Sequence, residues 1–470
     1  MHVLAPLAAP LAAALLWVPI MAEAAPDRAG LPETARVEQI LIDRIERDRA
    51  NIGIAIALIE DGVARFVSHG TLSRTDPTPV NEHTLFEAGS ITKVMTNVLL
   101  AQLVLAGKID LDAPLTRYLP AGTVLPAHNG RAITAFDLAT HHAGFSGLPE
   151  PLLADELGNP YSGYDAEALL AWIAAYRPPR ASGESFEYSN VGIALLAQAI
   201  EQVSGKDYAG LLEEQILAPL RMDDTRLALA PGPIENLAQG HDAAAEAVPH
   251  WDMDAFAPAG ALVTSSADLA KFVAAASGAA STPLDPAFAL MLDRLRPTGG
   301  GGEQIGLGWF VLNEGDRRIV WHNGITGGFR SFAGYDAKTG NGVVVLSNMN
   351  SMTGIEDIGL HLLDPAMPLR EQPRQRQEIA IDPAKIPAYT GDYLLAPGVV
   401  ITISATGDTL FAQITGQARY PIFAEAEDRF FFRIVDAQIS FAAPAAGTAP
   451  SLILHQNGRN LPALRLPAAR

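Results

Sequence analysis

The most informative absence in this sequence is cysteine, of which the 470 residues contain none. This excludes disulfide bridges, metal sites built on thiolates, a cysteine nucleophile and a lipidated cysteine. Basic residues are also scarce, because 33 lysines and arginines stand against 52 acidic residues and give a formal net charge of −19 at pH 7. Since nucleic acids and anionic lipid surfaces are bound through clustered lysine and arginine, neither is an expected partner.

Long apolar runs are absent beyond the N-terminus. From Val3 to Met21 the chain is apolar, and it then reaches Ala22-Glu23-Ala24, a small-x-small site followed by polar sequence. This layout is typical of a secretory signal peptide, so residues 1–24 are predicted to be removed on export. The alternative is a membrane anchor, since the stretch is nearly long enough to span a bilayer. We expect a periplasmic or secreted protein with no membrane span after cleavage.

The order of helix and strand patterns predicts one sheet assembled from two separated parts of the chain. β-branched runs at 52–59 and 63–67 flank Asp61-Gly62, a hairpin signal, and strand patterns return between 307 and 346. Helical patterns fill the segment between them, at 166–175, 191–203, 208–220 and 267–276. We therefore predict an α/β (α+β) domain over 31–368, with an antiparallel sheet flanked by helices and a large helical region.

The C-terminal part has a different pattern. Residues 369–384 are polar and lack apolar periodicity in their central stretch, so they are predicted to form a linker. From 385 to 470 only short strand patterns occur, at 399–403, 409–414, 430–434, 438–441 and 451–455. Short strands separated by turns predict a small all-β, barrel-like accessory domain.

A serine followed by a lysine three residues later opens one of the helical patterns. Ser90 lies where a loop becomes a helix, and positions i and i+3 share one helix face, so the Lys93 amine can approach the Ser90 hydroxyl. Backbone N–H groups at a helix N-terminus can also stabilise an oxyanion formed on attack. Alone, Ser-x-x-Lys is weak, because it also occurs where serine caps a helix and lysine is solvated.

Two further motifs lie far downstream. Tyr188-Ser189-Asn190 precedes a helical pattern, and its phenol and amide are groups that can exchange protons with a substrate or orient it. His322-Asn323-Gly324, followed by Ile325, lies in the returning strands, where glycine permits close approach to the backbone. Taken singly, the first could be a helix-entry loop and the second a tight turn.

Together and in this order, the three motifs resemble those of the penicillin-recognising serine hydrolases. This superfamily includes class C β-lactamases, D,D-peptidases, D-aminopeptidases and related esterases, and the similarity runs from about Asp43 to Leu363. The resemblance implies a β-lactamase-like fold in which Ser90 is acylated and Lys93 is its neighbouring amine. The C-terminal β module resembles the small barrel-like domain appended to some of these hydrolases.

By the same resemblance, Tyr188 would be the general base that activates Ser90 and then protonates the leaving group. Asn190 would position the substrate amide, and His322 and Gly324 would belong to the substrate-binding strand. The backbone N–H groups of Ser90 and Ile325 would form the oxyanion hole.

The sequence departs from the β-lactamase pattern at the third motif, where those enzymes have Lys-Thr-Gly. An imidazole at His322 is only partly charged at neutral pH and holds a substrate carboxylate less firmly than lysine. A literal Lys338-Thr339-Gly340 occurs, but its context predicts a hairpin turn. Arg330 is a candidate carboxylate contact, with a solvated strand residue as the favoured alternative.

Other chemistries lack their motifs. No Gly-x-Ser-x-Gly occurs, and His141-His142 has no partner histidines at metal-ligand spacing, so no metal or cofactor is predicted. We expect an exported serine hydrolase that cleaves an amide or ester bond of a β-lactam, a D-amino-acid peptide or a small ester through acyl-Ser90. The alternative is a penicillin-binding receptor or scaffold that is acylated without efficient turnover.

Overall fold

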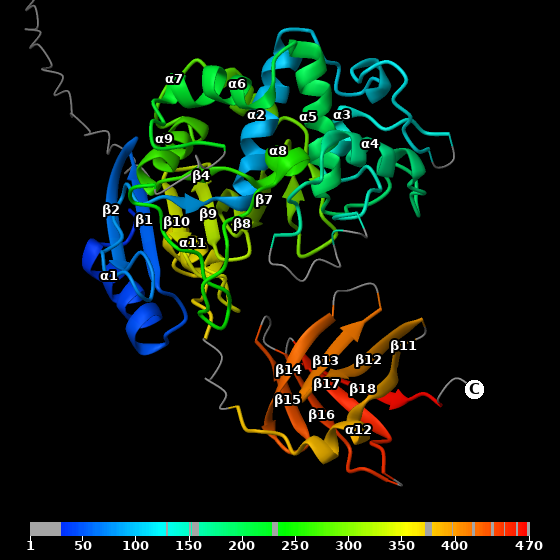
Figure 1. Cartoon of the computed structure of the whole chain (residues 1–470). Coiled ribbons are helices and arrows are strands. Elements are labelled where there is room, and N and C mark those ends of the chain that lie inside the picture. The colour runs from blue at the N-terminus through cyan, green and yellow to red at the C-terminus, as the bar shows by residue number, and fades with distance from the viewer. Residues whose placement is uncertain are drawn as a thin grey trace, which may run out of the picture. The chain divides into compact units, whose positions relative to one another are not determined.

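An eight-stranded antiparallel sheet is built from two distant parts of the chain (Figure 1). The computed structural model describes residues 30–127, 130–149, 152, 159–227, 234–371, 378–396, 398–415, 419–433, 437–445, 447–456 and 459–467. The strand order is β2-β1-β10-β9-β8-β7-β6-β5. The strands are β1 (Gly53–Glu60), β2 (Val63–Gly70), β5 (Arg296–Pro297), β6 (Gln304–Ile305), β7 (Phe310–Glu314), β8 (Arg317–Ile325), β9 (Arg330–Asp336) and β10 (Gly342–Ser347).

Two predicted turns of this sheet are confirmed. Asp61 and Gly62 connect β1 to β2 and have φ angles of 50° and 77°, as a two-residue hairpin loop with both residues at positive φ requires. The Lys338-Thr339-Gly340 stretch lies between β9 and β10, which pair as a hairpin. It is therefore a turn that follows the end of β9, whereas His322 lies within β8 and pairs with Ala333.

Both faces of the sheet are covered, so its central strands are buried on both sides. Ile56 and Leu58 of β1 pack in one core with α1 (Thr34–Ile42) and α11 (Glu356–Leu363). Ala55 and Ala57 point to the opposite face and belong to the larger core, which the helical region fills. Alternate side chains of a strand face opposite ways, so one apolar run can supply two cores.

The helical region lies between the two sets of strands in the sequence. Its helices are α2 (Thr92–Leu105), α3 (Ala135–Ala139), α4 (Ala166–Ala175), α5 (Asn190–Ser204), α6 (Tyr208–Leu212), α7 (Ala218–Leu220), α8 (Ala257–Gly260), α9 (Ser266–Ala276) and α10 (Asp285–Met291). The start of α2 follows a short pairing of β3 (Phe86–Glu87) with β4 (Val263–Thr264). α2 is buried on almost every side, against α5, α8 and α10. A polar side chain on this helix is therefore held among apolar neighbours.

The C-terminal β module is a closed barrel of eight antiparallel strands. They are β11 (Gly391–Ala396), β12 (Val399–Thr406), β13 (Thr409–Ile414), β14 (Arg419–Ala426), β15 (Arg429–Phe432), β16 (Ala437–Phe441), β17 (Ser451–Gln456) and β18 (Arg459–Arg465), and the short α12 (Ile386–Tyr389) precedes them. The predicted barrel is confirmed, although its sequence pattern indicated only five strands. β14 and β18 each contain a proline, Pro421 and Pro462, which weakens the strand pattern.

The predicted signal peptide, residues 1–24, and residues 372–377 of the predicted linker lie outside the described residues. Among those that are described, no helix has the length and apolarity needed to cross a membrane.

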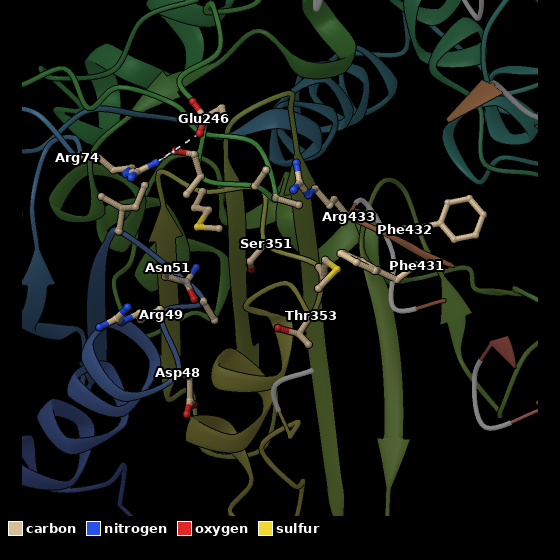
Figure 2. Close-up of a pocket in the computed structure, with 17 residues that line it drawn as sticks. Asp48, Arg49, Asn51, Arg74, Glu246, Ser351, Thr353, Phe431, Phe432 and Arg433 are labelled. Atoms are coloured by element: carbon tan, nitrogen blue, oxygen red, sulfur yellow. Dashed lines mark hydrogen bonds and ion pairs between the residues drawn. The ribbon is translucent and has the colours of Figure 1, made fainter. Parts of the chain in front are cut away.

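In the loop after β2, the Arg74 guanidinium lies 3.6 Å from the Glu246 carboxylate. The dashed line in Figure 2 marks this ion pair. This ion pair joins the first strands to the segment that follows α7.

Candidate active site

Ser90 and Lys93 meet at the start of α2, as their spacing predicted. A single 3-10 turn, Gly89–Ile91, carries Ser90 into the helix. The Lys93 Nζ lies 2.9 Å from Ser90 Oγ and donates to the Ala259 carbonyl at 2.5 Å. Lys93 is fully buried, and this burial holds the pKa of its amine well below the usual value of 10.5. Burial therefore favours the neutral amine, whose lone pair can accept the hydroxyl proton.

Tyr188 lies beside the same serine and lysine, with Lys93 Nζ 5.0 Å from the centroid of its ring. Ser189 is the N-cap of α5, since its Oγ accepts from the Gly192 N–H at 3.0 Å and donates to the Ser146 carbonyl at 2.8 Å. Tyr188 therefore has a fixed position just before the helix, and its hydroxyl is close enough to Ser90 for that serine to affect its pKa. Burial raises the pKa of this phenol above 10, although the Ser90 contact lowers it slightly. Tyr188 is a neutral phenol, not a phenolate.

The third motif touches the nucleophile turn through two glycines. A Cβ on Gly324 would lie only 1.9 Å from the Ala88 carbonyl oxygen, so no larger residue fits there. Gly89 has a φ of 52°, and a Cβ on it would lie 2.8 Å from the Ile325 nitrogen. The end of β8 is therefore packed against the backbone around Ser90. This closeness brings the Ile325 N–H to the same region as the N-terminus of α2.

His322 is fully buried on β8 and is uncharged. Its Nδ1 lies 2.6 Å from the Asn323 carbonyl oxygen, so Nδ1 carries the proton and donates it. Nε2 then carries the lone pair, and it has no hydrogen-bond partner among the described groups. Burial, reinforced by the charge that Lys93 carries when protonated, lowers the pKa of His322 to about 3. The sequence-based expectation of a partly charged imidazole is therefore wrong, because it took no account of burial.

Asn190 is the first residue of α5 and lies beside Tyr161. Its Nδ2 donates to the Tyr161 hydroxyl at 3.0 Å, whereas its Oδ1 has no partner among the described groups. Tyr161 packs edge-on against Trp251, with 5.2 Å between ring centroids. The amide oxygen is thus the free end of Asn190, and it can accept a hydrogen bond from a substrate N–H.

Comparison with known proteins agrees with this geometry. The model of the family described as Beta-lactamase matches residues 40–363. The chain belongs to the beta-lactamase family. A second model, a domain of unknown function (DUF3471), matches residues 375–463. The predicted family and its class of enzyme, a serine hydrolase, are thereby confirmed.

Relatives of this beta-lactamase family member carry several names. Penicillin-binding protein 4* of Bacillus subtilis is 26% identical over 433 residues, which cover 85% of this chain and 91% of the relative. A Beta-lactamase of Pseudomonas fluorescens is 28% identical, covering 63% of this chain and 88% of the relative. The octameric penicillin-binding protein homologue from Pyrococcus abyssi shares the fold with a TM-score of 0.63 and 21% identity, covering 92% of this chain and 100% of that one.

A class C β-lactamase structure shares the hydrolase fold. It superposes with a TM-score of 0.61 at 21% identity, covering 72% of this chain and 97% of its own. The predicted β-lactamase-like architecture is confirmed.

Arg330 does not face the site as a free cation. Its guanidinium lies 3.4 Å from Glu356, and its Nε donates to Asn350 at 2.8 Å. The same Glu356 oxygen accepts from the Asn323 amide at 2.8 Å. Glu356 therefore joins β8, β9 and the start of α11 at one point. Neither alternative considered for Arg330, a solvated residue or a substrate contact, describes this network.

Sequence reasoning missed three residues of this beta-lactamase-family site. Besides Glu356 and Tyr161, it missed His141, which it considered only as a candidate metal ligand. The His141 ring stacks on Tyr188 with 4.4 Å between centroids, and its Nδ1 accepts from the Ser189 N–H at 3.2 Å. Burial holds the pKa of His141 well below 6.5. No group of three or more metal-ligating side chains was found within the described residues, His141 and His142 included.

Proposed function

We propose that this protein is an exported hydrolase that cleaves an amide or ester bond through an acyl-Ser90 intermediate. The observation that carries the proposal is the contact of Ser90 Oγ with the Lys93 amine at 2.9 Å, with the Tyr188 ring centroid 5.0 Å from the same amine. A serine becomes a useful nucleophile only when an adjacent base takes its proton, and burial favours the neutral form of both neighbours here.

The proton path follows from these neutral states. As Ser90 Oγ bonds to the substrate carbonyl carbon, its proton passes to the lone pair of Lys93 Nζ. The resemblance implied that Tyr188 is the general base. Here we assign it the second part of that role: its hydroxyl donates a proton to the leaving nitrogen or oxygen and then accepts one from protonated Lys93. Expulsion of the leaving group yields the ester of Ser90, and water then attacks it with the same proton transfers in reverse.

The negative charge that develops on the carbonyl oxygen needs donors already in place. We assign the backbone N–H groups of Ser90 and Ile325 to this role, because the contact of Gly89 with Ile325 brings them together. Asn190 positions the substrate through its free amide oxygen, while His322 and Gly324 line the strand along which the substrate lies.

Export and domain organisation are part of the same proposal. Residues 1–24 have the layout of a signal peptide, so we place the mature protein in the periplasm or outside the cell. We assign residues 31–368 to the hydrolase domain, 369–384 to a linker and 385–470 to an accessory domain. Separate apolar cores on either side of the linker support this division.

A substrate panel on the wild type and on Ser90→Ala tests the function. We expect hydrolysis of at least one substrate among p-nitrophenyl esters, nitrocefin and D-alanyl amides, and its loss in Ser90→Ala. Wild-type levels of turnover by Ser90→Ala would falsify the proposal. A burst of one equivalent without steady turnover would instead favour the penicillin-binding receptor, a possibility kept open by the replacement of the third-motif lysine with His322.

A further inference from the structure

The groups around Ser90 offer no uncompensated positive charge within the described part of the chain. Lys93 is buried between Ser90 and the Ala259 carbonyl, and this burial holds the pKa of its amine well below 10.5. Arg180, which precedes the Tyr188 motif, is paired with Glu187. His250 lies 2.8 Å from the Glu87 carboxylate. Each of these three basic side chains is thus buried or lies against a carboxylate of the protein itself.

His322 presents a lone pair at the position where β-lactamases have a lysine, whose positive charge would attract an anion. Its single proton is on Nδ1 and is committed to the Asn323 carbonyl at 2.6 Å. Nε2 is buried, and no described group would accept a proton from it if the ring became charged. Burial disfavours protonation of the ring, so a carboxylate next to this imidazole would face another acceptor, and two acceptors without a shared proton repel each other.

Of the arginines on β8 and β9, Arg330 lies nearest to the oxyanion-hole residue Ile325, since the two residues pair in register. It is held by Glu356 at 3.4 Å and by Asn350 at 2.8 Å. Glu356 and Arg330 are both largely buried, with side chains 9% and 15% exposed. To reach a substrate, Arg330 would have to leave a buried carboxylate, and that exchange is unfavourable.

We propose that this site selects neutral acyl substrates, namely esters and amides with no carboxylate beside the bond that is cut. The proposal rests on the acyl-Ser90 function and names its substrate class. A carboxylate entering the site loses its hydration and gains no positive partner, which disfavours it. β-Lactam antibiotics and peptides ending in a free D-alanine carry such a carboxylate, so they are poor substrates compared with their neutral counterparts.

A matched pair of esters tests the charge selectivity on the full-length protein. Methyl 3-acetoxybenzoate and 3-acetoxybenzoate share the acetyl ester that is cut and differ in whether the leaving phenol carries a methyl ester or a carboxylate. Each kcat/KM is divided by the rate constant of that ester with hydroxide, which removes the difference in intrinsic reactivity. We expect the neutral ester to be preferred at least tenfold. A smaller ratio of the two normalised kcat/KM values, neutral ester to carboxylate ester, overturns the proposal.

Variants of His322 assign the selectivity to its charge. His322→Lys is expected to narrow the ratio at least tenfold by raising kcat/KM for the carboxylate ester, whereas His322→Gln, also neutral, keeps the wild-type ratio. If His322→Lys does not fold, Glu356→Gln takes its place, because it removes the negative charge that pairs with Arg330 and is expected to narrow the ratio in the same direction. An unchanged ratio in the folded charge variant contradicts the proposed cause.

The outcomes separate this inference from the function on which it rests. If both esters acetylate Ser90 with equal efficiency, the acyl-serine function stands and the selectivity is wrong. If Ser90→Ala hydrolyses both esters as fast as the wild type, the function itself is wrong.

Discussion

Glu356 is the residue whose replacement most sharply tests how the third motif is held in place. One of its carboxylate oxygens accepts from Asn323 on β8 at 2.8 Å and lies 3.4 Å from Arg330 on β9. The other accepts from the Ile355 N–H at 3.1 Å. Ile325, whose N–H we assign to the oxyanion hole, pairs in register with Arg330. Glu356→Gln leaves a single acceptor oxygen for three donors, so at least one donor loses its partner.

The size of the effect follows from burial and charge. Breaking a fully buried ion pair costs about 3–5 kcal/mol, but Arg330 retains its bond to Asn350 and the pair is not completely buried. We expect the free energy of unfolding to fall by roughly 2–3 kcal/mol, in line with hydrogen bonds to charged groups. Removal of one oxyanion donor costs about 100-fold or more in kcat, so a displaced Ile325 N–H is expected to cost roughly tenfold. KM for a neutral ester should change little, because this contact strengthens only in the transition state.

Urea unfolding followed by tryptophan fluorescence and steady-state kinetics on methyl 3-acetoxybenzoate measure the two effects. Glu38→Gln is the matched control, since Glu38 lies exposed on α1 and its loss should change stability by less than about 0.5 kcal/mol. If Glu356→Gln matches this control in both stability and kcat, Glu356 does not hold the strand and the reasoning is refuted.

Three further predictions concern the buried groups around Ser90. Tyr188→Phe should lower kcat by about 100-fold or more while circular dichroism stays unchanged, and a loss below threefold excludes Tyr188 from proton transfer. Lys93→Met should abolish turnover yet raise the free energy of unfolding at pH 7. The Lys93 pKa is lowered on folding, so the unfolded chain binds a proton that the folded protein lacks, and wild-type stability rises with pH towards 10.5. The stability advantage of Lys93→Met should therefore shrink between pH 7 and pH 10 in chemical denaturation, and a constant gap contradicts a neutral Lys93. His322, with its pKa lowered to about 3, makes the wild type lose stability as pH falls from 6.5 towards 3, by up to about 1.4 kcal/mol per pH unit. His322→Gln should remove this part of the acid slope, and identical slopes show that the ring is protonated in the folded state.

Local spacing was enough to predict the chemistry at the start of α2. Ser90 and Lys93 are one helical turn apart, so their contact depends only on the helix that the following apolar residues form. The close contact at Gly324 was also predictable, because glycine in a strand indicates close backbone approach. In the structure the Ala88 carbonyl occupies the space that a side chain would need. The hairpin at Asp61-Gly62 was also predictable from local sequence, because Asp-Gly between two strand patterns favours a two-residue turn with positive φ angles. Both residues have these angles in the structure.

What the sequence could not predict depends on contacts between distant segments. The charge of His322 is set by its burial, which no pattern around residue 322 reveals. Glu356 acts through Asn323 and Arg330, each more than 20 residues away, and Tyr161 meets Asn190 across 29 residues. The barrel strands that were missed are defined by pairing with neighbours, as when β11 closes the barrel against β18.

The central claim, that Ser90 carries the acyl group, is tested most directly by trapping the intermediate. Wild-type protein is mixed with methyl 3-acetoxybenzoate, quenched in acid within milliseconds and digested, and the peptide that contains Ser90 is examined by mass spectrometry. We predict one acetyl group on Ser90 that forms during the pre-steady-state phase and disappears when the ester is exhausted. An acetyl group on another residue, or turnover with Ser90 unmodified at every time point, contradicts the account.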